Sequence, residues 1–121
     1  MDALSRTVLI VDDDPQILRL VEKMLRPRTV RILLAPWPSK ALEICASEPI
    51  DLLISDVAMP EMDGHKLAEK VLQLRPGTSI LLISGQSKEE ARAAHRRLKF
   101  LQKPFFPSDL LAAMKELLPE L

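Results

Sequence analysis

The sequence has little of what directs a chain out of the cell, into a membrane or onto nucleic acid. Its only cysteine, Cys45, excludes an internal disulfide and fits a reducing compartment. The N-terminus carries no visible signal peptide, and no apolar run approaches the roughly 18 residues of a membrane span. Seventeen basic residues balance seventeen acidic ones, so no net positive charge is available to hold phosphates. We therefore expect a cytoplasmic protein with no membrane contact and no direct nucleic acid binding.

The length and composition are typical of one globular domain. The chain has 121 residues, of which 47% are hydrophobic and 28% are charged, a balance that supports a packed core. It shows no internal repeat, no low-complexity segment and no linker. We expect a single domain over residues 1–121, with no separate output domain.

Short apolar runs alternate along the chain with segments of helical spacing. Apolar residues spaced by three and four predict five helices, which begin near Pro15, Ser39, Leu67, Ser87 and Ser108. The alternation predicts an α/β fold in which helices cover both faces of a parallel sheet. Five runs lack polar alternation, as strands buried on both faces do: Val8–Val11, Ile32–Ala35, Leu52–Ser55, Ile80–Ser84 and Phe100–Gln102.

Polar residues gather where these predicted strands end. In open α/β sheets, ligands bind beyond the carboxyl ends of the strands, so these residues are the candidates for chemistry. We interpret Asp14, before Pro15, mainly as a helix cap. The residues at the strand ends are Asp12, Asp13 and Asp14 after the first strand, Asp56 after the third, Ser84 at the end of the fourth and Lys103 after the fifth.

These residue types favour phosphoryl transfer. Carboxylates packed together repel one another unless a cation or a proton compensates their charge. An oxygen-only set without cysteine or histidine favours a hard ion such as Mg²⁺. Lys103 would supply further positive charge, and Ser84 a hydrogen bond to a phosphoryl oxygen.

Four ordered motifs resemble those of one known family. They are Val8–Asp13, Asp56–Gly64 with the pattern D-x-x-M-P-x-M-D-G, Leu82–Gly85 and Lys103–Phe105. Together they closely resemble the receiver domain of two-component response regulators, and the resemblance covers essentially all 121 residues. It implies a doubly wound (βα)₅ flavodoxin-like fold, with a five-stranded parallel sheet in the order 2-1-3-4-5.

The resemblance also implies roles for the acidic residues. Asp56 matches the phosphoacceptor, whose carboxylate attacks phosphorus to form an aspartyl phosphate. Asp12 and Asp13 match the acidic pair that holds Mg²⁺, with Asp13 and Asp56 as direct ligands. The backbone carbonyl of Ala58 resembles the third protein ligand of the family. The resemblance therefore implies a signalling switch and not an enzyme, because such a domain catalyses only its own phosphorylation and dephosphorylation.

A second group of residues resembles the switch of the family. Ser84 matches the hydroxyl that closes on the phosphoryl group, and Lys103 the lysine that pairs with it. Phe100 matches the aromatic residue that turns inward when the hydroxyl moves. The implied signalling face combines the predicted helix over 87–97 with the strand at Phe100–Gln102 and the helix that begins near Ser108.

The resemblance implies partners as well. The phosphodonor would be a histidine kinase or a phosphotransfer protein, and a downstream effector protein or domain would read the switch. The outer edge of the last helix is a candidate surface for a phosphorylation-dependent dimer. His65 and His95, on predicted helices, are interpreted as solvated, and Trp37 as an aromatic packed on the surface.

Two other functions are considered beside this one. A haloacid-dehalogenase-type phosphatase would use Asp12 as nucleophile and Asp14 as acid/base, but it leaves the motif at Asp56 unexplained and needs a cap. A receiver that is never phosphorylated would act only as a docking module. The presence of all the phosphorylation residues argues against it.

Overall fold

The sheet has the predicted architecture. The computed structural model describes residues 6–27, 30–85 and 97–119. Its five strands form one parallel sheet in the order β2-β1-β3-β4-β5, which confirms the expected (βα)₅ strand order. The strands are β1 (Arg6–Val11), β2 (Val30–Ala35), β3 (Leu52–Asp56), β4 (Ser79–Ser84) and β5 (Leu98–Gln102).

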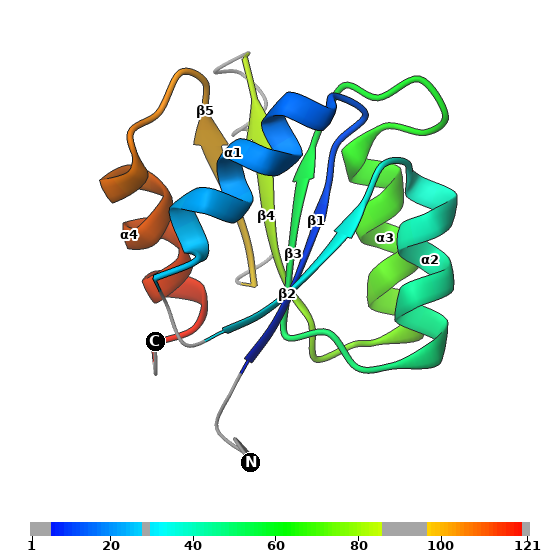
Figure 1. Cartoon of the computed structure of the whole chain (residues 1–121). Coiled ribbons are helices and arrows are strands. Elements are labelled where there is room, and N and C mark those ends of the chain that lie inside the picture. The colour runs from blue at the N-terminus through cyan, green and yellow to red at the C-terminus, as the bar shows by residue number, and fades with distance from the viewer. Residues whose placement is uncertain (1–5, 28–29, 86–96, 120–121) are drawn as a thin grey trace.

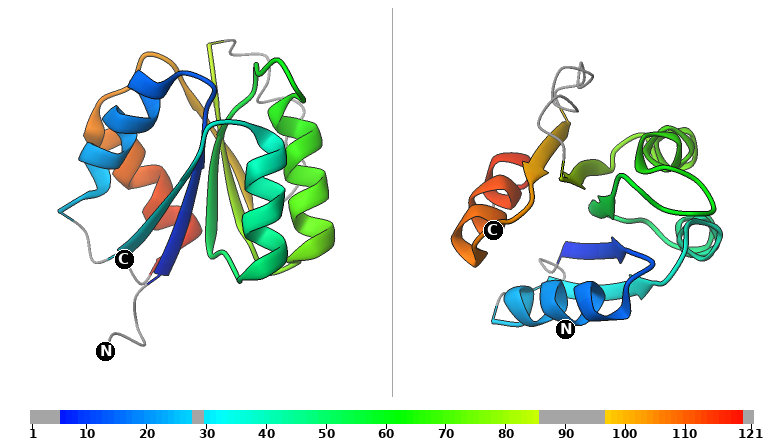
Figure 2. Two further views of the ribbon diagram at one scale, coloured as in Figure 1. Left: turned by 45° about the vertical axis from the view of Figure 1, so that its right-hand side comes forward. Right: turned by 90° about the horizontal axis from the view of Figure 1, so that it is seen from above.

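Helices cover both faces of the sheet. In the described residues they are α1 (Pro15–Leu25), α2 (Pro38–Ser47), α3 (Gly64–Leu74) and α4 (Pro107–Leu117). Figures 1 and 2 show α1 and α4 on one face and α2 with α3 on the other. The helix that was predicted to begin near Ser108 is therefore α4. The helix predicted over 87–97 lies, except for Arg97, outside the described residues.

The strands alternate between two hydrophobic clusters. In β1, Val8 and Ile10 face the cluster under α1 and α4, while Leu9 and Val11 face the cluster under α2 and α3. Burial on both faces explains why the strands read as unbroken apolar runs. Cys45 is buried in the second cluster, as a small hydrophobic residue would be.

Two aspartates begin helices at the carboxyl edge of the sheet. Asp14 caps α1, because its side chain accepts a hydrogen bond of 2.9 Å from the Gln16 amide. Asp63 caps α3 in the same way, through a bond of 2.8 Å from the Lys66 amide. Within the described residues, no helix combines the length and the apolar character that crossing a membrane requires.

Candidate acidic site at the carboxyl edge of the sheet

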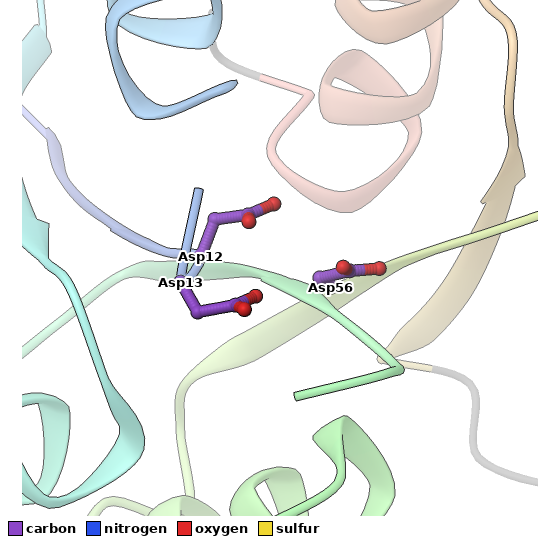
Figure 3. Close-up of side chains that lie close together, drawn as sticks. All are labelled: Asp12, Asp13 and Asp56. Carbon is purple, nitrogen blue, oxygen red and sulfur yellow. The ribbon is translucent and has the colours of Figure 1, made fainter. Parts of the chain in front are cut away.

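Three of the predicted carboxylates lie together. One side-chain oxygen from each of Asp12, Asp13 and Asp56 lies within 4.8 Å of the others (Figure 3). The strands explain this, because β1 and β3 are parallel neighbours and Val11 pairs with Ser55. The residues that follow this pair therefore emerge side by side. The predicted convergence of the strand ends is confirmed for these three residues.

The environments of the three carboxylates differ. Asp12 is only 4% exposed, Asp56 is half-buried and Asp13 faces solvent. Burial raises the pKa of Asp12 from 3.8 to about 6, and the nearby charges of Asp56 and Asp13 add to this rise. The Asp14 amide, which donates a 2.9 Å hydrogen bond to Asp12 Oδ1, and the Lys103 ammonium lower it in part. Asp12 therefore retains a proton at pH values where an ordinary aspartate is fully ionised.

Lys103 reaches the acidic cluster from the far side of β4. It follows the last residue of β5, and its backbone amide donates a 2.8 Å hydrogen bond to the Ser84 carbonyl. Its Nζ lies 3.4 Å from Asp56 Oδ1. The Asp56 side chain is 12% exposed, so this ion pair is partly shielded from water. The predicted lysine thus contacts the predicted phosphoacceptor.

Ser84 lies one strand away from Asp56. It is the last residue of β4 and is 7% exposed. Asp56 pairs with Ile83 on the adjacent strand, so Ser84 is one residue beyond that pair. The sheet therefore puts the hydroxyl at the same edge as the carboxylates, as the sequence predicted.

Phe100 lies deeper along the sheet and has an unexpected neighbour. It pairs with Leu82 on β4 and packs against the cluster under α2 and α3. The His65 ring lies against it, with centroids 5.5 Å apart and planes tilted by 46°. The interpretation of His65 as a solvated residue was wrong, because this side chain is half-buried against Phe100. This contact depends on how the start of α3 and β5 come together in the folded chain, and no local sequence pattern indicates that arrangement.

The loop after Asp56 is held against the sheet at both ends. The Val57 amide donates a 3.0 Å hydrogen bond to the Ile83 carbonyl, and the Gly64 amide donates one of 2.8 Å to the Val57 carbonyl. A Cβ atom on Gly64 would lie 2.4 Å from the Asp56 carbonyl oxygen. Only glycine lets α3 begin this close to the Asp56 backbone. Ala58 lies exposed in this loop, two residues after Asp56.

The donor set fits a hard divalent cation. The three clustered side chains offer only carboxylate oxygens, and Lys103 is the one cation among the described residues with an ion pair to them. Mg²⁺ prefers such oxygen ligands and retains several waters of its own. The residues present are therefore suited to hold Mg²⁺ together with a phosphoryl group.

Comparisons with known proteins agree with this geometry. The family model described as the response regulator receiver domain matches residues 8–115. An uncharacterised 14.6 kDa protein of Leptolyngbya boryana is 36% identical over 90% of this chain and 87% of its own length. Response regulator receiver protein CpdR of Brucella abortus is 30% identical over 93% of this chain and 97% of its own length.

A solved structure and a longer relative complete the comparison. The chemotaxis protein CheY4 of Vibrio cholerae has a TM-score of 0.82 and 28% identity, covering 93% of this chain and 98% of that one. Transcriptional regulatory protein GlrR of Escherichia coli is 31% identical, and there the chain spans only 26% of the relative's length. With a family model that matches most of its length, this chain belongs to the response regulator receiver domain family.

Proposed function

We propose that this chain is a phosphoacceptor switch that takes a phosphoryl group onto Asp56 from a histidine kinase or a phosphotransfer protein. The observation that carries the proposal is the position of Asp56, which lies in the acidic cluster and 3.4 Å from Lys103. In this proposal residues 1–121 act as one receiver domain. Such domains are signalling domains and not enzymes that turn over a separate substrate.

The chemistry follows from the groups around Asp56. A carboxylate oxygen of Asp56 attacks phosphorus, the phosphorus–nitrogen bond of the donor phosphohistidine breaks, and the imidazole nitrogen keeps the electron pair. The product is an aspartyl phosphate. Lys103 would then pair with a phosphoryl oxygen, and the Ser84 hydroxyl would donate a hydrogen bond to another.

Mg²⁺ belongs to the same proposal. Asp12 and Asp13 would form the acidic pair that holds the ion, with Asp13, Asp56 and the Ala58 carbonyl as the direct protein ligands. When bound, the ion neutralises charge on the phosphoryl oxygens and on the carboxylates. Without such a cation, three carboxylates within 4.8 Å oppose the approach of an anionic phosphoryl group.

An effector would recognise the phosphorylated state at a surface formed by β5 and α4 together with the segment between β4 and β5. Ser84 and Phe100 are the proposed switch residues, and Phe100 lies on β5 itself. An ion pair of 2.9 Å between Lys99 of β5 and Glu116 of α4 joins the two elements on this face. An effector protein or domain would bind here, and a second phosphorylated copy is a further candidate.

A phosphatase that uses Asp12 is supported less well. Asp12 is 4% exposed, and burial raises its pKa, so its carboxyl group is a poorer source of the ionised nucleophile than an ordinary aspartate. Asp14 would be the acid/base in that mechanism, but its carboxylate caps α1 by accepting a hydrogen bond from the Gln16 amide. The alternative also gives no role to the contact between Asp56 and Lys103.

Intact-mass measurement after incubation with acetyl phosphate tests the proposal. We expect one base-labile phosphoryl adduct that requires Mg²⁺ and is absent from Asp56→Ala. Glu43→Ala, which removes an exposed carboxylate from α2, is the matched control and should be phosphorylated normally. An adduct that persists in Asp56→Ala, or turnover of a phosphate ester that depends on Asp12 alone, contradicts the assignment. A folded wild type that binds Mg²⁺ but gives neither an adduct nor a beryllium fluoride complex would be a docking module.

A further inference from the structure

Helix α2 begins without a side-chain cap of its own. Its N-cap residue is Trp37, which makes no capping hydrogen bond, and Pro38 is the first helical residue. The Ser39 amide instead donates a 2.6 Å hydrogen bond to Glu61 Oε1, while the Ser39 hydroxyl donates one of 3.0 Å to Glu61 Oε2. Glu61 belongs to the loop between β3 and α3, which extends over the start of α2 in Figure 1.

This contact does for α2 what an N-cap side chain usually does. The first amides of a helix have no partner inside the helix, and the helix dipole favours a negative group beside them. Glu61 satisfies one such amide from a distant part of the chain, and it uses both carboxylate oxygens on one residue. The carboxylate is therefore fixed in orientation as well as in position.

The loop that Glu61 anchors is the one that follows Asp56. Hydrogen bonds of Val57 and Gly64 fix its two ends, and Met59 is buried beneath it. Between these points the loop is exposed at Ala58 and again at Glu61. Met62 also packs against the cluster under α2 and α3, and the bond from Ser39 ties the exposed Glu61 directly to the start of α2.

We infer that Glu61 is a positioning residue for cation binding, because it clamps the loop that carries Ala58 onto the N-terminus of α2. This inference rests on the proposed function, in which the Ala58 carbonyl is a ligand of Mg²⁺. Coupling between two sites is reciprocal, so an ion that fixes the loop also strengthens the cap on α2. Trp37, two residues before Ser39, therefore senses the ion although it lies outside the acidic cluster.

Trp37 makes this coupling measurable. It is the only tryptophan in the sequence and its side chain is 52% exposed, so its emission responds to movement of the loop before α2. We expect Mg²⁺ to change the fluorescence of the wild type and to leave that of Glu61→Ala unchanged. No phosphodonor is needed for this measurement.

Calorimetric titration with Mg²⁺ gives the affinities. Glu61→Ala should weaken Mg²⁺ binding by about fivefold, the factor that corresponds to the loss of one helix cap. Ser39→Ala, which loses only the hydroxyl contact, should weaken it by about twofold, and the two changes should not add in the double variant. Glu43→Ala removes an equal charge from α2 away from the loop and should bind Mg²⁺ as the wild type does.

Two further variants separate positioning from charge and from stability. Glu61→Asp retains the charge but is too short to keep both bonds, so Mg²⁺ affinity equal to that of the wild type would show a simple charge effect and overturn the inference. Adding Trp37→Asn to Glu61→Ala gives α2 its own cap, since Trp37 already has the extended backbone of an N-cap residue. Stability should recover in that double variant while Mg²⁺ binding stays weak.

The remaining outcomes are also decisive. Recovery of Mg²⁺ affinity together with stability would show that Glu61 supports only α2, and unchanged affinity in Glu61→Ala would show no role at all. Either result overturns this inference and leaves the proposed function intact. A wild type that binds no Mg²⁺ would overturn both.

Discussion

The two edges of the sheet use aspartate in opposite ways. At the carboxyl edge, Asp12, Asp13 and Asp56 place oxygens within 4.8 Å of one another. At the amino edge, Asp51 accepts a 2.8 Å hydrogen bond from the Thr7 amide and pairs with Arg6 at 3.4 Å. The carboxyl edge therefore places like charges together, whereas the aspartate at the amino edge has a positively charged partner of its own.

The backbone strengthens this contrast. The Asp51 amide donates to the Thr7 carbonyl at 2.9 Å, and its carbonyl accepts from the Ser79 amide at 3.0 Å. Asp51 thus joins β1 to β4 through its own backbone and side chain. Charged groups held in this way stabilise a fold, whereas like charges held together cost stability and are retained for function. The comparison predicts opposite effects for changes at the two edges.

Gly64→Ala at the carboxyl edge should have the largest effect. The added Cβ would lie 2.4 Å from the Asp56 carbonyl and 3.0 Å from Val57 Cα, so backbone must move. We expect a loss of about 3 kcal/mol in the free energy of unfolding, measured by urea denaturation. Gly77→Ala is the control near the amino edge, because its Cβ would have no neighbour within 4 Å. Equal stability of the two variants would show that the close approach of α3 to Asp56 has no cost.

Asp12→Asn should have the next largest effect, and it should raise the free energy of unfolding instead of lowering it. The pKa of Asp12 is raised from 3.8 to about 6, chiefly by burial. Between about pH 4 and pH 6 the unfolded chain releases this proton while the folded chain keeps it, so stability falls as pH rises. In Mg²⁺-free buffer at pH 7.5 the variant should be more stable than the wild type by about 2 to 3 kcal/mol.

The pH dependence distinguishes this cause from a packing effect. The difference between Asp12→Asn and the wild type should shrink toward pH 4, because the pH then approaches the unfolded-state pKa of 3.8 and Asp12 becomes protonated in the unfolded chain as well. Asp13→Asn is the control, because Asp13 faces solvent and its removal relieves no burial of charge. A gain in stability that is the same at pH 4 and pH 7.5 would contradict the explanation.

The sequence was sufficient to predict which residues gather at the carboxyl edge. The carboxyl ends of parallel strands lie at one edge of a sheet, and the strand order that the family resemblance implied makes the strands of Asp12, Asp13 and Asp56 neighbours. The ion pair from Lys103 to Asp56 follows from the same topology. These predictions depended on runs of buried apolar residues, which are the strongest local signal in the chain.

Contacts between distant loops and helix ends could not be predicted in this way. The bond from Ser39 to Glu61 and the packing of His65 on Phe100 depend on how α3 sits in three dimensions. The start of β5 was also misplaced, at Phe100 instead of Leu98, because Lys99 interrupts the apolar run. Lys99 is accommodated because β5 is an edge strand and its ammonium pairs with Glu116.

Asp51→Asn should have the smallest of these effects and completes the comparison. The amide oxygen can still accept from Thr7, but the attraction to Arg6 is lost, and the pair is partly exposed to water. We expect a loss of about 1 kcal/mol in the free energy of unfolding, one that shrinks in high salt because exposed charges are screened. Neutralising an aspartate would then stabilise the chain at Asp12 and destabilise it at Asp51. A gain at both positions would mean that any aspartate charge at the sheet edges lowers stability, whatever its partners at each edge.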